Sequence, residues 1–331
     1  MTSSRERART GERSRERRRS LGIALEGDRS HHELTRLALL AEKLKLDSVH
    51  LYEHLPYRSA WASAFLIARE TSCVKVGPVT VPALAYEPLM LARLAASLRE
   101  VAGERALLGI SRGAFGELIG RTRPKVDEFA AYLRRVHSLL EEERLSLTQS
   151  WSKRELPKIY VGTSGTKVSA MAAKMPFVSG VVVDNLWDSG YARILSSNVR
   201  EARKEVSLNP EDFELIARPF CYVCDDRRAA LSALQPILRG YVAQLIGDSP
   251  MLRYAGLDTN SLKEALQGPP AQVEDVISRF AFFGTVEELE AQLEELFDSG
   301  VTQVVLGYPL GPDPEDAIRS IARAALTLNR P

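Results

Sequence analysis

Short apolar runs alternate with amphipathic stretches along almost the whole chain, and this alternation limits the possible folds more than any other feature. Eight runs rich in β-branched residues are each followed by a segment of helical periodicity. The predicted strands cover residues 20–27, 48–54, 74–81, 105–111, 158–164, 179–185, 213–223 and 301–307. Strands that are apolar on both faces are typical of parallel sheets covered by helices on each side.

Eight strand–helix units in a chain of 331 residues fit an α/β protein with a TIM (β/α)8 barrel and insertions. A doubly wound open sheet is the alternative. The first predicted strand is not followed by the G-x-G-x-x-G turn of dinucleotide-binding sheets, and the barrel is therefore favoured. The sequence predicts one barrel domain over residues 21–331, with a less regular insertion at about 248–283.

The composition agrees with a globular protein of a reducing compartment. Hydrophobic residues make up 45% of the chain and charged residues 26%. No apolar run approaches the roughly 20 residues that cross a bilayer. Three cysteines are too few for a disulfide framework, and no spacing of His, Cys, Asp and Glu suggests a metal site. We expect a cytoplasmic location, no membrane partner and no bound metal.

Residues 1–20 differ from the rest of the chain. They contain eight arginines and three glutamates, so they contribute a charge of +5, and the remaining residues sum to −4. The segment has no leucine, isoleucine, valine or aromatic residue and is predicted to be a disordered tail. An arginine-rich arm is one way to bind nucleic acid. Because the rest of the chain has no basic excess, we expect no nucleic-acid partner.

In a TIM barrel the functional residues follow the C-terminal ends of the strands. Glu26 ends the first predicted strand, and the adjacent Glu53 and His54 end the second. A histidine beside a carboxylate shuttles protons near neutral pH or hydrogen-bonds a heterocycle, and capping of a turn is the alternative for this pair. Neighbouring strand residues face opposite ways, so we expect His54 rather than Glu53 to face the barrel interior.

The turns after the third, fourth and fifth strands have features of a ligand site. Pro78 and Pro82 bracket Val79 and Thr80, and a central strand is expected to bulge there. Small and hydrogen-bonding residues follow the next two strands, and tight turns without a ligand are the alternative reading. Backbone N–H groups in such turns bind anions, phosphate in particular. The residues concerned are Ser111, Arg112, Gly113, Gly162, Thr163, Ser164 and Gly165.

Four stretches of the sequence resemble one family of enzymes. Residues 280–318 contain the pattern G-x-P-x-G-P-D, and residues 74–88, 105–120 and 254–259 carry further motifs. In this order around a barrel they resemble the bacterial luciferase-like superfamily. Within it, the chain is most similar to the coenzyme F420-dependent 5,10-methylenetetrahydromethanopterin reductases. The resemblance spans nearly all of residues 21–328.

The resemblance implies hydride transfer from reduced coenzyme F420 to the one-carbon unit of a pterin, in a homodimer or homotetramer. Glu26 and His54 are the predicted catalytic residues, with Glu26 in place of a strand-one glutamate of the reductases where this chain has Ala24. A non-prolyl cis peptide of the relatives corresponds to Pro78–Val79. The predicted coenzyme contacts are Glu53, His54, Pro78, Val79, Thr80, Ser111, Arg112, Gly113, Gly162, Thr163, Ser164 and Gly165.

Other functions remain open from the sequence. Another F420-dependent dehydrogenase is one, and an FMN-dependent luciferase-like monooxygenase, with FMN in place of F420, is a second. A non-catalytic flavin-binding barrel is an alternative of a different class, because a fold does not by itself specify an activity.

Overall fold

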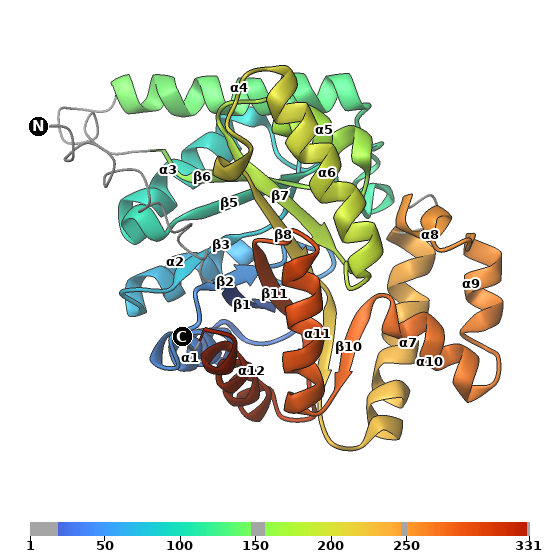
Figure 1. Cartoon of the computed structure of the whole chain (residues 1–331). Coiled ribbons are helices and arrows are strands. Elements are labelled where there is room, and N and C mark those ends of the chain that lie inside the picture. Colours follow the sequence, from blue (N-terminus) through green and yellow to red (C-terminus); the bar gives the residue numbers. More distant parts are fainter. Residues whose placement is uncertain (1–18, 147–155, 246–249, 330–331) are drawn as a thin grey trace, which may run out of the picture.

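The predicted apolar runs lie side by side as parallel strands around one axis, with helices outside them (Figure 1). The computed structural model describes residues 19–146, 156–245 and 250–329. The sheet runs β3-β2-β1-β11-β8-β7-β6-β5-β4, and β3 and β4 are two halves of the third strand, so the sheet closes. The predicted TIM barrel is confirmed. The barrel strands are β1 (Ser20–Leu25), β2 (Ser48–Leu51), β3 (Lys75–Pro78), β4 (Val81–Pro82), β5 (Leu107–Ser111), β6 (Lys158–Gly162), β7 (Val178–Asp184), β8 (Glu214–Arg218) and β11 (Gln303–Leu310).

Amphipathic helices cover the outer face of the barrel and bury their apolar sides against it. The helices are α1 (His31–Lys43), α2 (Ala60–Glu70), α3 (Pro88–Ala102), α4 (Val126–Ser146), α5 (Thr166–Ala173), α6 (Ser189–Glu205), α7 (Arg227–Leu245), α11 (Val286–Asp298) and α12 (Pro314–Leu328). Short 3-10 turns are η1 (Gly103–Arg105), η2 (Gly116–Ile119) and η3 (Pro210–Asp212). Among the described residues, the helices are too short or too polar to cross a membrane.

The third strand is divided where two prolines bracket Val79 and Thr80. β3 pairs with β2, whereas β4 pairs with β5. The peptide bond between Val79 and Thr80 is cis. The cis bond was predicted at Pro78–Val79, one residue too early, and this prediction was wrong. Pro78 is the last residue of β3 and still pairs with Leu51 of β2. The irregular backbone begins after Pro78, at Val79 and Thr80.

The predicted seventh strand is also divided, and it connects the barrel to the insertion. Its second half is β9 (Phe220–Val223), which pairs with β10 (Ala281–Gly284) and with β11. Three short helices precede β10 in the sequence, and they lie beside α7 on one flank of the barrel (Figure 1). They are α8 (Pro250–Tyr254), α9 (Thr259–Ala265) and α10 (Pro270–Ser278). The segment predicted as less regular therefore contains three helices. The predicted tail covers residues 1–20. Residues 1–18 lie outside the described residues, and only Arg19 and Ser20 of the tail are described.

Two glycines make room for the third strand inside the barrel. A Cβ atom at Gly109 would lie 2.7 Å from Cγ1 of Val79, and one at Gly162 would lie 2.6 Å from Cγ2 of Thr80. The Val79–Thr80 segment thus packs against backbone that has no side chain of its own. Val79 belongs to an apolar layer inside the barrel, whose other members are Ala24, Tyr52, Leu107, Tyr160, Val182, Ile216 and Val305.

Candidate active site

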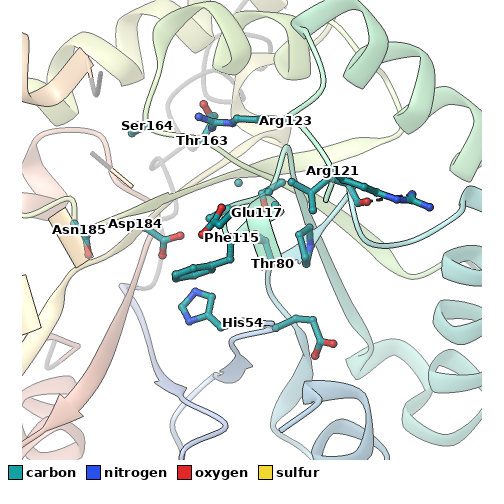
Figure 2. A pocket seen from close by; sticks show the side chains of 18 of the residues that line it. His54, Thr80, Phe115, Glu117, Arg121, Arg123, Thr163, Ser164, Asp184 and Asn185 are labelled. Carbon is teal, nitrogen blue, oxygen red and sulfur yellow. Dashed lines mark hydrogen bonds between the residues drawn. The ribbon is translucent and has the colours of Figure 1, made fainter. Parts of the chain in front are cut away.

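A cavity of about 330 Å³ opens at the C-terminal ends of the strands (Figure 2). Its wall consists of the turns after β2, β4, β5, β6 and β7, together with Met251 of α8. This is the face on which TIM barrels place their active sites. The volume lies at the lower end of the range of pockets for organic ligands and cofactors.

His54 in the cavity wall is joined to Glu26 from the neighbouring strand. Oε2 of Glu26 lies 2.7 Å from Nδ1 of His54, and Oε1 accepts a hydrogen bond from the backbone N–H of Gly27 at 3.0 Å. Glu26 is 7% exposed. A carboxylate in this position fixes the tautomer of the imidazole, because the proton on Nδ1 lies toward Glu26. The structure thus brings together the two predicted catalytic residues.

Aromatic rings hold the imidazole of His54 on several sides. The ring of Tyr52 stacks on it with centroids 5.2 Å apart, and Phe115 approaches edge-on at 5.8 Å. Tyr57 lies at 6.5 Å. Burial, and then the charges of Glu26 and Asp28, raise the pKa of the Tyr57 phenol. Tyr57 therefore stays protonated in the neutral range and presents a neutral phenol to the imidazole.

Glu53 has a different role from its neighbour. Its Oε2 accepts a hydrogen bond from the backbone N–H of Ala60 at 2.5 Å, at the first turn of α2, and its Oε1 accepts one from the hydroxyl of Tyr86. The hydroxyl of Ser59 donates to the same carboxylate at 3.3 Å. Glu53 borders the cavity, but its carboxylate caps α2. Of the two roles considered for this pair, turn capping applies to Glu53. His54 has the position facing the cavity that was predicted for it.

The opposite end of the cavity favours an anion. Gly165 occupies the N-cap position of α5 and has no side chain to cap it. The N–H of Gly165 donates a hydrogen bond to Oγ1 of Thr163 at 3.0 Å. Ser164, the residue before Gly165, lies in the cavity wall, so the N-terminus of α5 is next to the cavity. In Figure 2, Thr163, Ser164 and Arg123 lie at one end of the view and His54 at the other. A helix N-terminus next to an arginine attracts phosphate or carboxylate.

Eight of the predicted site residues border the cavity, and five do not. The eight are Glu53, His54, Thr80, Ser111, Gly113, Gly162, Thr163 and Ser164. The other five are Glu26, Pro78, Val79, Arg112 and Gly165. Arg112 is placed outside the wall because its Nε donates to the carbonyl of Pro124 at 2.7 Å. The loop after β5 instead brings Arg123 to the cavity.

Several residues of this region were given no role from the sequence. Asp184 and Asn185 line the cavity at the end of β7, and Phe115 and Met251 line it from the loop after β5 and from α8. The rule that functional residues follow the strand ends points to Asp184 and Asn185 as well, but no local feature assigned them a role. Arg218 ends the apolar run ELIAR, and a charge at that position was a signal that went unused. No group of three or more potential metal ligands occurs among the described residues.

A parallel barrel with a polar cavity at its C-terminal face is the architecture of many cofactor-dependent oxidoreductases. A model of the luciferase-like monooxygenase family matches residues 17–303, and the chain belongs to this family.

Proteins with known activities are similar over nearly the whole chain. The 5,10-methylenetetrahydromethanopterin reductase of Archaeoglobus fulgidus is 25% identical over 91% of this chain and 97% of its own. The reductase of Methanolobus tindarius is 22% identical over 88% of this chain and 94% of its own.

Solved structures share the fold. The coenzyme F420-dependent tetrahydromethanopterin reductase of Methanopyrus kandleri superposes with a TM-score of 0.77 at 22% identity, over 93% of this chain and 98% of its own. An F420-dependent secondary alcohol dehydrogenase superposes with a TM-score of 0.76 at 16% identity, over 95% of this chain and 100% of its own. The family predicted from the sequence is confirmed.

The capping role of Glu53 predicts a change in stability. Replacement Glu53→Gln removes the negative charge at the start of α2, and we expect the free energy of unfolding to fall by about 1 kcal/mol. Urea unfolding followed by circular dichroism measures it. The control is Glu70→Gln at the exposed end of the same helix, where loss of a negative charge is neutral or slightly favourable. Equal stability of Glu53→Gln and the unmodified protein would contradict the capping role.

Proposed function

We propose that the chain is a coenzyme F420-dependent oxidoreductase that transfers a hydride to a one-carbon unit carried by a tetrahydropterin, in the manner of methylenetetrahydromethanopterin reductases. The observation that carries the proposal is the hydrogen-bonded Glu26–His54 pair, of which His54 lines the cavity, in a barrel whose full-length relatives are such reductases. The pterin is the proposed substrate, and an alcohol is the second candidate because the alcohol dehydrogenase superposes almost equally well.

The residues of the cavity fit this coenzyme. The uncapped start of α5, the hydroxyls of Thr163 and Ser164 and the cation of Arg123 match its phosphodiester. The hydroxyls of Thr80 and Ser111 are hydrogen-bonding groups suited to the polar edge of a heterocycle. The bound coenzyme supplies the hydride, and the protein supplies orientation and a suitable electrostatic environment.

His54 is the proton-holding group of the proposed reaction. With the Nδ1 proton directed to Glu26, the second proton of the ring is gained and lost at Nε2. Opening of a methylene bridge between two nitrogen atoms requires a proton at the departing nitrogen. Nε2 of protonated His54 supplies this proton, and the carboxylate of Glu26 stabilises the charged ring until it does so.

Apolar side chains restrict water around the reacting atoms. Phe115 and Leu84 border the cavity, and Met251 closes it from the insertion. Phe115 also contacts the ring of His54. Hydride transfer benefits from a dry site because orientation and electrostatic interactions are both stronger there.

An anaerobic assay tests the proposal directly. We expect the purified protein to oxidise reduced F420 in the presence of methylenetetrahydromethanopterin, followed by the absorbance of the oxidised coenzyme. The same mixture with acetone in place of the pterin tests the second candidate. Consumption of reduced FMN that requires oxygen, without any turnover of F420, would contradict the proposal and identify a monooxygenase.

The Glu26–His54 pair predicts a loss of rate when the carboxylate is removed. Replacement Glu26→Ala removes the oxygen that lies 2.7 Å from Nδ1 of His54. The imidazole then loses the contact that orients it, and we expect kcat to fall by about tenfold or more.

The control for this loss is Asp28→Asn, which removes a neighbouring carboxylate that lies 4.0 Å from Nε of Arg29. We expect this variant to keep the kcat of the unmodified enzyme. Initial rates at saturating pterin give kcat for both variants. An unchanged kcat in Glu26→Ala would exclude proton donation by the pair.

A further inference from the structure

Arg218 is a charged side chain almost completely buried inside the barrel. It ends β8, and its exposed fraction is 1%. Arginine is rarely buried to this extent unless its charge is paired. The side chain points inward, because Ile216, two residues before it on the same strand, belongs to the apolar layer that fills the barrel.

The guanidinium group of Arg218 contacts residues at the ends of three other strands. Its Nε lies 2.5 Å from Oδ1 of Asp184 on β7, and its Nη2 lies 3.0 Å from Oδ2 of the same carboxylate. Its Nη1 donates a hydrogen bond to the carbonyl of Val79 at the end of β3. Its carbon Cζ lies 4.2 Å from the centroid of the Tyr52 ring, which follows β2. The fork of two parallel bonds to one carboxylate is a geometry that lysine cannot make.

Each of these three contacts leads to the cavity wall. Asp184 lines the cavity directly, and its side chain is 31% exposed. Val79 is joined through the cis peptide bond to Thr80, which lines the cavity. Tyr52 stacks on His54, which lines it as well. One buried cation therefore connects the parts of the wall that come from β7, β3–β4 and β2.

Stability alone does not explain an ion pair at this position. A buried pair stabilises a fold little more than apolar residues of the same volume do, because both charges lose their hydration. The apolar layer, which includes Tyr52 and Val79 beside the guanidinium, shows that the interior of this barrel accepts apolar residues. What the guanidinium provides in addition is a fixed geometry for three wall segments at once.

We propose that Arg218 is a positioning residue of the cavity. It sets the affinity for the ring system of the bound coenzyme by fixing Asp184, Thr80 and His54 relative to one another. The inference rests on the proposed function only for the identity of that ring, because the contacts of Arg218 belong to the protein itself.

The test compares Arg218→Lys with the unmodified protein. Lysine keeps the charge but cannot form the fork or bond Val79 at the same time. We expect the dissociation constant of oxidised F420, measured by fluorescence quenching, to increase about tenfold or more. We also expect added methylguanidinium to restore part of the affinity in Arg218→Ala and to have no such effect on the unmodified protein.

A matched control separates positioning from general stability. Arg203 is 5% exposed, donates from Nε to the carbonyl of Asn209 at 2.9 Å and lies over the ring of Phe213, at the far end of α6. We expect Arg203→Lys to lower the melting temperature while the affinity for F420 stays within about twofold. A lower melting temperature in Arg218→Lys together with unchanged affinity would overturn the inference.

The outcomes distinguish this inference from the proposed function. If the unmodified protein binds FMN and not F420, the proposed function fails, and the affinity of the variants for FMN tests Arg218 in the same way. A crystal structure of Arg218→Lys provides a readout that needs no ligand. We expect Thr80 and His54 to be displaced in it, and an unchanged wall would overturn the inference. If Arg218→Lys does not fold, Asp184→Asn weakens the same fork and is measured in its place.

Discussion

The structure of the cavity depends on the way the third strand of the barrel closes the sheet. β3 bonds to β2 and β4 bonds to β5, and the two residues between them, Val79 and Thr80, turn toward the barrel axis. Gly109 and Gly162 leave the space that this turn occupies. The turn exposes Thr80 to the cavity and presents the carbonyl of Val79 to a buried arginine. The closure of the sheet and the shape of the site are therefore one structural feature.

Two pairs of opposite polarity organise the chemistry above this turn. Glu26 and His54 form the first pair, at the border between β1 and the turn after β2. Asp184 and Arg218 form the second, deeper in the barrel. The ring of Tyr52 lies between the two pairs, because it stacks on His54 and makes a cation–π contact with the guanidinium of Arg218. The pair proposed for proton transfer is therefore linked through Tyr52 to the Asp184–Arg218 pair, and both lie on the face that TIM barrels use for catalysis.

Local sequence patterns predicted the strands and eight of the residues that line the cavity. Alternating apolar runs located the eight barrel segments, and strand ends identified His54, Thr80 and the turn at Gly162–Ser164. The failures have a common physical origin in contacts between distant residues. The capping of α2 by Glu53 depends on where Tyr86 and Ala60 lie in space.

The role of Arg218 is the strongest example of this limit. An arginine at the end of an apolar strand has no local feature that distinguishes a solvated end from a buried one. Its partner Asp184 lies 34 residues away, and Val79 lies 139 residues away. Only the closure of the barrel brings the three together. A residue whose role depends on contacts with distant parts of the chain therefore cannot be recognised from the local sequence around it.

A crystal structure of the protein with oxidised coenzyme F420 tests the central claim most directly. The account predicts that the deazaflavin ring lies against His54 and Thr80 in the barrel mouth, with the phosphate at Thr163 and Ser164. Binding of the coenzyme outside this cavity, or no binding at concentrations that saturate the related reductases, would contradict it.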